Sequence, residues 1–251
     1  MKILRAFSAL LLAALVLLPL PAASAAGDSV RYEVDGKKYE GYFISPGKKA
    51  PLVLLIHDWD GLTDYEVKRA GMLAEKGYAV FAADLFGAGI RPTKVEDRRQ
   101  HTGELYRDRE KLRRLMTGAL ETAATKGADT GNAVAMGYCF GGAAVLELVR
   151  SGADLKGFAT FHGGLGTPPG QDYSKARGEI LVMHGTADSA ITMDVFAALA
   201  KELETAGVKH EMVTYSGAPH AFTVFGSNRY HEEADRQSWQ RFNGFLEEIV
   251  N

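Results

Sequence analysis

Residues 133 to 144 read Ala133-Val134-Ala135-Met136-Gly137-Tyr138-Cys139-Phe140-Gly141-Gly142-Ala143-Ala144. The stretch begins as a short apolar run and passes through Gly-x-Cys-x-Gly-Gly into residues that favour a helix. In a strand-turn-helix element of this kind, the flanking glycines allow so tight a turn that the residue between them stands clear at the helix N-terminus. The positive end of that helix favours a thiolate and the oxyanion that follows its attack. The stretch therefore predicts that Cys139 is a nucleophile in an α/β fold.

Cys139 also has a simpler interpretation. It is the single cysteine of the sequence, so it cannot form a disulfide within the chain. A lone cysteine is often an ordinary buried thiol, because cysteine is among the most buried residue types. The glycines on both sides of it, at a junction between strand and helix, favour the nucleophile over the buried thiol.

An acid and a base follow Cys139 in the order that an α/β-hydrolase requires. Asp188 comes shortly after the apolar run 180–183, and His220 comes shortly after the run 212–215. Taken singly, the aspartate could cap the helix that follows it, and the histidine could be an ordinary loop residue. Taken together and in this order, they predict that His220 acts as the base and that Asp188 orients it.

Apolar runs and helical patterns alternate along the rest of the chain. A hairpin with its turn at Asp35-Gly36 is expected over residues 30–44. The apolar runs lie at residues 52–56, 79–83, 133–136, 158–161, 180–183 and 212–215. The helical patterns lie at residues 65–76, 104–126, 143–150, 193–206 and 232–249. Because the runs are continuous rather than alternating, they predict a mostly parallel, doubly wound sheet with helices on both faces and a site at the carboxyl ends of its strands.

The composition excludes several classes of function. With 251 residues, of which 46% are hydrophobic, and a formal charge of -2, the chain suits one domain and has no positive field to attract nucleic acid. The basic stretch 91–114 is interleaved with acidic residues, so it is interpreted as a solvated helix and its approach loop. No cluster has metal-ligand spacing and no phosphate-binding loop follows a strand, so we expect neither metal nor cofactor. The oligomeric state stays open.

The N-terminus has the features of a secretory leader. Lys2 and Arg5 precede an apolar run from Ala6 to Leu20, and Ala23-Ser24-Ala25 supplies the small residues of a cleavage site. The alternative is a membrane anchor, but the run is short of the ~20 apolar residues that span a bilayer. We therefore expect a signal peptide at residues 1–25, an exported and periplasmic protein, and no stable membrane insertion once the leader is removed.

Four motifs together resemble the dienelactone hydrolases. They are Gly-Tyr-Cys-Phe-Gly-Gly at 137–142, His-Gly-Thr-Ala-Asp at 184–188, Pro-His-Ala-Phe at 219–222 and Ile-His-Asp-Trp-Asp-Gly at 56–61. The resemblance covers nearly all of residues 26–251, and it is specific because most α/β-hydrolases have serine where this chain has Cys139. It implies a single α/β-hydrolase domain that hydrolyses an enol-lactone or a related ester through a thioester intermediate.

The resemblance also implies an oxyanion hole and a residue that modulates the thiol. The backbone N–H groups of Phe140 and Trp59 are expected to bind the oxyanion. Members of the family carry a glutamate that keeps the resting thiol in check, and this chain has Asp58 in its place. Since aspartate is one methylene shorter, either it reaches Cys139 less well or the loop is displaced to compensate.

The substrate pocket departs from the family pattern. Dienelactone enzymes hold the substrate carboxylate with arginines, one of them shortly after the catalytic histidine, and here Val224 occupies that position. Arg91 is the candidate for supplying the charge from another loop. Aromatic residues expected to line the pocket would suit small neutral esters; they are Trp59, Phe86, Tyr138 and Phe222.

Three functions consequently stay open. The first is a dienelactone-type lactonase, and the second is a carboxylesterase with broad specificity for small esters. The third is a non-catalytic binding relative, which is disfavoured because such proteins generally lack a triad member. Three further histidines end strands on the active-site side and are interpreted as packed, hydrogen-bonded residues; they are His57, His162 and His184.

Overall fold

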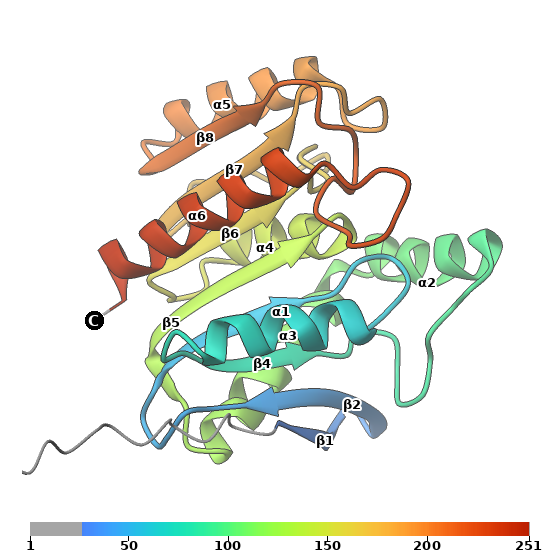
Figure 1. Cartoon of the computed structure of the whole chain (residues 1–251), viewed down its shortest axis with the longest axis vertical. Helices are drawn as coiled ribbons and strands as arrows, with labels where there is room; N and C mark the ends of the chain where they lie inside the picture. The colour runs from blue at the N-terminus through green and yellow to red at the C-terminus, as the bar shows by residue number, and fades with distance from the viewer. Residues whose placement is uncertain (1–26, 251) are drawn as a thin grey trace, which may run out of the picture.

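An eight-stranded sheet runs through the residues that this computed structural model describes, 27–250 (Figure 1). Its strands are β1 (Asp28–Val34), β2 (Lys37–Ile44), β3 (Pro51–Ile56), β4 (Ala79–Ala83), β5 (Asp129–Tyr138), β6 (Gly157–Phe161), β7 (Glu179–Gly185) and β8 (His210–Tyr215). They are arranged in the order β1-β2-β4-β3-β5-β6-β7-β8. The pairs from β4 to β8 are parallel, and β2 pairs antiparallel with β1 and β4. The expected hairpin and mostly parallel doubly wound sheet are confirmed.

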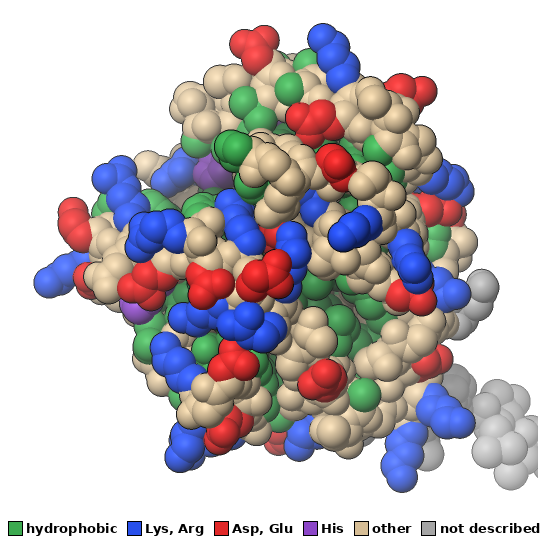
Figure 2. Space-filling model, turned by 180° about the vertical axis from the view of Figure 1, so that it is seen from behind, with side chains coloured by type: hydrophobic (Ala, Val, Ile, Leu, Met, Phe, Trp, Pro, Cys, Tyr) green, Lys and Arg blue, Asp and Glu red, His purple; other side chains and the backbone are tan. Residues whose placement is uncertain are grey.

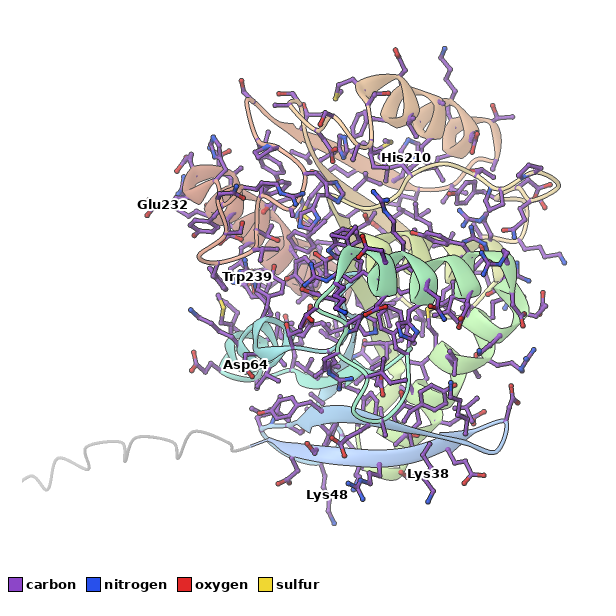
Figure 3. All side chains as sticks on the ribbon, turned by 90° about the vertical axis from the view of Figure 1, so that its right-hand side faces the viewer. Lys38, Lys48, Asp64, His210, Glu232 and Trp239 are labelled. Carbon is purple, nitrogen blue, oxygen red and sulfur yellow. The ribbon has the colours of Figure 1, made fainter. Side chains whose placement is uncertain are left out.

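Helices cover both faces of the sheet. They are α1 (Asp64–Ala74), α2 (Val95–Arg107), α3 (Arg109–Thr125), α4 (Phe140–Ser151), α5 (Met193–Thr205) and α6 (Glu232–Ile249). Side chains of α1 and α6 pack with one face of the sheet, and those of α3, α4 and α5 pack with the other. Figure 3 shows Asp64 of α1 together with Glu232 and Trp239 of α6 on the same side of the molecule. The inner strands are therefore shielded on both faces, which explains their continuous apolar runs.

One helix prediction was wrong. The pattern at 104–126 predicted a single helix, but two helices, α2 and α3, meet at Asp108. The backbone of Asp108 leaves the helical region there, with φ -113° and ψ 79°. Its Oδ1 accepts the N–H of Lys111 at 2.9 Å, so Asp108 ends one helix and caps the next.

The topology selects one edge of the sheet for a site. The chain passes from β3 to β4 on one side of β3 and returns through β5 on the other side. The strand order therefore reverses between β3 and β5, and the loops that leave their carboxyl ends diverge to opposite faces. A crevice beyond the carboxyl ends of the strands at such a switch point is the usual ligand site of an open α/β sheet.

The molecular surface carries charges of both signs. On the face shown in Figure 2, basic and acidic side chains are interspersed rather than gathered into a patch of one sign. In the basic stretch 91–114, ion pairs join Arg98 to Asp60 and Arg114 to Asp35. None of the helices within residues 27–250 has the length and apolar character needed to cross a bilayer. The predicted leader lies outside the described residues.

Candidate active site

The turn from β5 into α4 places Cys139 at the base of a cavity. The residue sits at the N-cap of α4 with φ +50°, a left-handed conformation that most side chains avoid. A Cβ on Gly137 would overlap the backbone of Gly141, and a Cβ on Gly141 would overlap the Ile56 carbonyl oxygen. Glycine is needed at both positions because backbone approaches backbone this closely, and the resulting turn directs the thiol into the crevice.

His220 and Asp188 lie beside this thiol. The His220 Nε2 atom is 3.1 Å from the Cys139 Sγ atom, and its Nδ1 atom is 2.7 Å from Asp188 Oδ2. The other carboxylate oxygen of Asp188 accepts the N–H groups of Ala190 and Ile191, each at 2.9 Å. Although burial opposes ionisation, the hydrogen bonds from His220 and these amides hold the pKa of Asp188 below its ordinary value. The structure thus brings the three predicted residues into one hydrogen-bonded line.

The thiol is held in its neutral form. Burial raises the pKa of Cys139 well above its ordinary value, and the charge of Asp58 and its hydrogen bond to the sulfur act in the same direction. The hydrogen bond from the Phe140 N–H partly opposes them. Burial, with the nearby charge of Asp60, also raises the pKa of Asp58 to about 6. Asp58 therefore reaches the thiol although it is shorter than glutamate.

Asp58 also engages one of the two expected oxyanion donors. The Trp59 N–H donates to Asp58 Oδ1 at 2.5 Å. The Phe140 N–H hydrogen-bonds to the Cys139 sulfur. For both amides to bind a substrate oxygen, the Asp58 carboxylate has to move away from the Trp59 N–H.

A cavity of about 400 Å³ opens above the thiol. It is lined by Asp58, Trp59, Asp60, Arg98, Cys139, Ala190, His220, Ala221, Val224, Ser227, Asn228 and Arg229. Sequence reasoning did not anticipate its polar lining residues Asp60, Arg98, Ser227, Asn228 and Arg229. The last three belong to the segment 221–231 between His220 and α6, and its position directly after the predicted base was the signal available. Nothing in the sequence marks Arg98, because α2 approaches the cavity from more than 30 residues before the nucleophile.

Three aromatic residues expected in the pocket lie in the core instead. Phe86, Tyr138 and Phe222 are 4%, 0% and 0% exposed, and none of them lines the cavity. Phe86 packs on Phe140, and Tyr138 packs on Phe161. Each follows or ends a strand whose two faces are covered, so its ring turns inward to the core. Trp59 does line the cavity.

Arg91 does not supply a charge to the cavity. Its guanidinium donates to the carbonyl oxygens of Ile90 and Glu40 at 2.8 and 3.3 Å and lies 3.7 Å from Asp84 Oδ1. That prediction is wrong, because the buried Asp84 carboxylate attracts the side chain toward β2. Val224 does line the cavity, as its position after His220 indicated.

Two of the remaining histidines are packed and hydrogen-bonded, as interpreted. His57 Nε2 accepts the Leu85 N–H at 3.2 Å, so its Nδ1 is the donor to the Asp58 carbonyl oxygen 2.6 Å away. His184 Nε2 lies 2.9 Å from the Ile191 carbonyl oxygen. Both rings support the loops that carry the site and do not enter its cavity.

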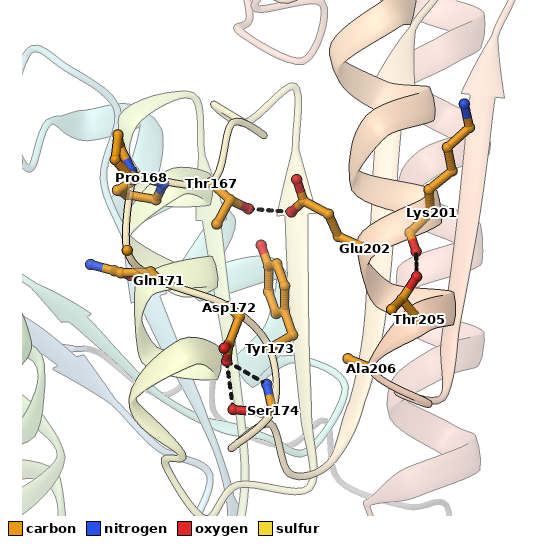
Figure 4. A pocket seen from close by; sticks show the side chains of 12 residues that line it. Thr167, Pro168, Gln171, Asp172, Tyr173, Ser174, Lys201, Glu202, Thr205 and Ala206 are labelled. Atoms are coloured by element: carbon orange, nitrogen blue, oxygen red, sulfur yellow. Dashed lines mark hydrogen bonds between the residues drawn. The ribbon is translucent and has the colours of Figure 1, made fainter.

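A second groove, of about 600 Å³, lies between α5 and the segment that follows β6. Figure 4 shows hydrogen bonds between some of its polar side chains, from Thr167 to Glu202 and from Ser174 to Asp172. It contains none of Cys139, Asp188 and His220. The smaller cavity, which Cys139 and His220 line, is therefore the candidate active site.

Comparisons with known proteins agree with this fold. Residues 39–250 match the model of the dienelactone hydrolase family. A Saccharolobus solfataricus protein named "Putative carboxymethylenebutenolidase" is 24% identical over 257 residues, covering 87% of this chain and 97% of that protein. The solved structure named m3DLH is 31% identical with a TM-score of 0.85, covering 91% of this chain and 100% of that one. A dienelactone hydrolase-like promiscuous phosphotriesterase from metagenomic libraries is 28% identical, with the same TM-score and coverage. The chain thus belongs to the dienelactone hydrolase family, and it is a hydrolase with the α/β-hydrolase fold.

Proposed function

We propose that this protein hydrolyses lactones or small carboxylic esters with Cys139 as nucleophile, His220 as base and Asp188 as the residue that orients the base. The observation that carries the proposal is the line of contacts from Sγ to Nε2 at 3.1 Å and from Nδ1 to Oδ2 at 2.7 Å. A nucleophile within reach of a base that a third group orients is the arrangement that covalent acyl transfer requires.

In the first step, the thiol proton moves to His220 Nε2 while the sulfur attacks the substrate carbonyl carbon. Since the pKa of the thiol is raised, the base has to act during the attack and not before it. Asp188, whose pKa is lowered, stays ionised and stabilises the imidazolium that forms. The new S–C bond places the carbonyl electron pair on oxygen as an oxyanion.

The oxyanion takes the N–H groups of Phe140 and Trp59 as its donors. Substrate binding therefore displaces the Asp58 carboxylate from the Trp59 N–H, to which it bonds at 2.5 Å in the resting protein. Collapse of the intermediate breaks the bond to the alcohol oxygen, which takes the proton from His220. Water then attacks the thioester with His220 as base, and the carboxylic acid and free thiol are released.

Among possible substrates, we propose small neutral esters and lactones over carboxylated ones. Val224 presents an apolar wall where the family places an arginine, and Arg91 is engaged by Asp84. Arg98 is already partnered, at 3.6 Å from Asp60 and over the Trp59 ring. Burying a carboxylate beside an apolar wall without a partner is costly. Arg229, at the exposed end of the lining, is the cation that remains.

The test compares Cys139→Ala with the unmodified protein on a dienelactone and on short aryl esters. Loss of hydrolysis with an unchanged fold supports the nucleophile, and a trapped acyl group on Cys139, seen as added mass, identifies the thioester. An active, well-folded Cys139→Ala variant contradicts the proposal. An unmodified protein that binds esters without turnover would favour the non-catalytic alternative.

The proposal includes export. The basic start, apolar run and Ala23-Ser24-Ala25 support cleavage after Ala25. Intact-mass measurement of periplasmic material should then find a chain that begins at Ala26. Detection of residues 1–25 on the exported protein would contradict this part alone.

A further inference from the structure

His162 is a buried histidine that the proposed reaction does not use. It follows β6, the strand between those that lead to Cys139 and Asp188. Its side chain is fully buried, its φ is +42°, and it does not line the active-site cavity. Its ring centre lies 5.5 Å from that of His220, at an interplanar angle of 67°. The ring therefore forms one wall of the space in which the His220 imidazole sits.

Thr223 ties this ring to the loop that carries His220. The His162 Nε2 atom lies 2.8 Å from Thr223 Oγ1, and the Tyr65 hydroxyl lies 2.7 Å from the same oxygen. Arg69 Nη2 donates to the Thr223 carbonyl oxygen at 3.0 Å. Hydrogen bonds therefore fix both the side chain and the backbone of Thr223, which lies three positions after His220.

Helix α1 provides the anchor at the far end. Arg69 forms a buried ion pair with Asp235 of α6, and its Nε donates to the Tyr65 hydroxyl at 3.3 Å. Both side chains of the ion pair are at least 90% buried, so breaking one bond would leave a polar group without water. The network therefore connects α1 and α6 to the loop that carries His220.

The same turn of α1 holds the loop after β3. Glu66, next to Tyr65, accepts the Thr63 N–H at 2.8 Å and the Asp58 N–H at 3.3 Å. Adjacent residues of α1 thus bind the loop that offers the Trp59 amide and the loop that offers His220. One rigid helix fixes the spacing between oxyanion donor and base.

The ring of His162 is suited to this position because it is neutral. Burial, and then the charge of His220, lower the pKa of His162 well below its ordinary value. A neutral ring can pack against the imidazolium that His220 becomes during the reaction without repelling it. A cation in the same place would oppose the proton transfer.

We propose that His162, Thr223 and Tyr65 are positioning residues, which hold the His220 imidazole toward Cys139 through a buried network anchored on α1. The proposal rests on the proposed function, since it assigns a purpose to groups around that base. It predicts effects on turnover rather than on substrate binding, because none of the three residues lines the cavity.

The experiment uses steady-state hydrolysis of a short aryl ester. Thr223→Val removes the hydroxyl and keeps the shape, and Tyr65→Phe removes its partner hydroxyl and keeps the ring. Each should lower kcat by about 10-fold, since small misplacements of a catalytic group cost up to about 100-fold, with KM unchanged within about twofold. The double variant should lose little more than the worse single variant, because both remove the same connection.

Three further variants complete the test. Thr223→Ser restores the hydroxyl and should recover most of kcat. His162→Asn, which tolerates positive φ, should lower kcat without changing KM. The matched control is Thr122→Val on α3, whose hydroxyl donates to the Gly118 carbonyl oxygen far from the network; it should keep the original kcat.

Circular dichroism and thermal melting accompany each variant. A folded Thr223→Val or Tyr65→Phe protein with unchanged kcat overturns the proposal, as does a change confined to KM. If Thr223→Val does not fold, Tyr65→Phe decides, because it deletes a single hydroxyl. Cys139→Ala, measured in parallel, distinguishes failure of the proposed function from failure of the positioning proposal. If Cys139→Ala stays active, the proposed function is wrong. If Cys139→Ala is inactive while the Thr223 and Tyr65 variants keep their kcat, only the positioning proposal is wrong.

Discussion

Replacing Asp58 with asparagine should lower the pKa of the Cys139 thiol and so increase the fraction present as thiolate. Asparagine keeps an oxygen that can accept the Trp59 N–H. It removes the negative charge of the carboxylate that hydrogen-bonds to the Cys139 sulfur. A carboxylate about 4 Å from a thiolate opposes it by up to about 4 kcal/mol at an effective dielectric constant of about 20. The wild-type protein can reduce this repulsion by protonating Asp58 when the thiolate forms.

The free-energy cost of protonating Asp58 sets the size of the effect that Asp58→Asn has on the thiolate fraction. The pKa of Asp58 is about 6, so the carboxylate is neutral below that pH and is harder to protonate by about 1.4 kcal/mol for each pH unit above it. The fraction of Cys139 present as thiolate should therefore be higher in Asp58→Asn than in the parent, by about tenfold at pH 7 and about 100-fold at pH 8. Below pH 6 the two should converge, since the charge is absent from both.

The assay is the rate of Cys139 alkylation by iodoacetamide between pH 5.5 and 8.5, followed by intact mass. Both proteins carry His220→Ala, so that no imidazole accepts the thiol proton. Because the charge of His220 also lowers the pKa of Asp58, the parent rate in this background should level off somewhat above pH 6, while the Asp58→Asn rate should keep rising about tenfold per unit up to pH 8. The matched control is Asp64→Asn, an exposed aspartate at the start of α1, which should follow the parent.

Two results would refute the reasoning. One is a parent rate that rises tenfold per unit across pH 6 to 8, which would mean that Asp58 does not restrain the thiol. The other is an Asp58→Asn rate equal to that of the parent at pH 8. Either outcome would leave burial, without Asp58, to account for the raised thiol pKa.

Three further changes have defined outcomes. Asp188→Asn should lower kcat by about 10³- to 10⁴-fold, because an amide no longer selects the productive tautomer of the base; a loss below tenfold would contradict this. Val224→Arg should raise the kcat/KM ratio of a carboxylated lactone to its neutral methyl ester by about 10- to 100-fold. A wild-type protein that already prefers the charged lactone strongly would show that another cation, such as Arg229, binds it. Gly141→Ala should lower the free energy of unfolding in urea by about 2 kcal/mol or more, since its Cβ would overlap the Ile56 carbonyl; an unchanged midpoint would refute that.

The sequence predicted the parts of this fold that local chemistry determines. Continuous apolar runs located the inner strands, because a strand covered on both faces has no polar side to interrupt the run. The glycines around Cys139 identified the tight turn, since only glycine allows backbones to approach so closely. The order of nucleophile, acid and histidine then indicated which loops meet at one edge of the sheet.

The cavity wall could not be predicted in the same way. An aromatic residue at the end of a strand can turn into the core or into a pocket, and the choice depends on which helix covers it. Phe86 turns to the core because Phe140 and His57 lie beside it. Arg98 lines the cavity from α2, a helix that the sequence pattern did not separate from α3. Contacts between distant segments therefore decide the pocket, and no local pattern encodes them.

The neutral, buried state of the single thiol has a consequence for its chemical lifetime. Peroxides oxidise the thiolate rather than the thiol, first to a sulfenic acid and then to irreversible acids. The sequence offers no second cysteine that could trap the sulfenic acid as a disulfide. Under the proposed mechanism, the nucleophile stays protonated until the substrate displaces Asp58. We therefore expect the carboxylate that raises the thiol pKa also to slow oxidation of the proposed nucleophile, and Asp58→Asn should shorten the half-life of activity in dilute hydrogen peroxide.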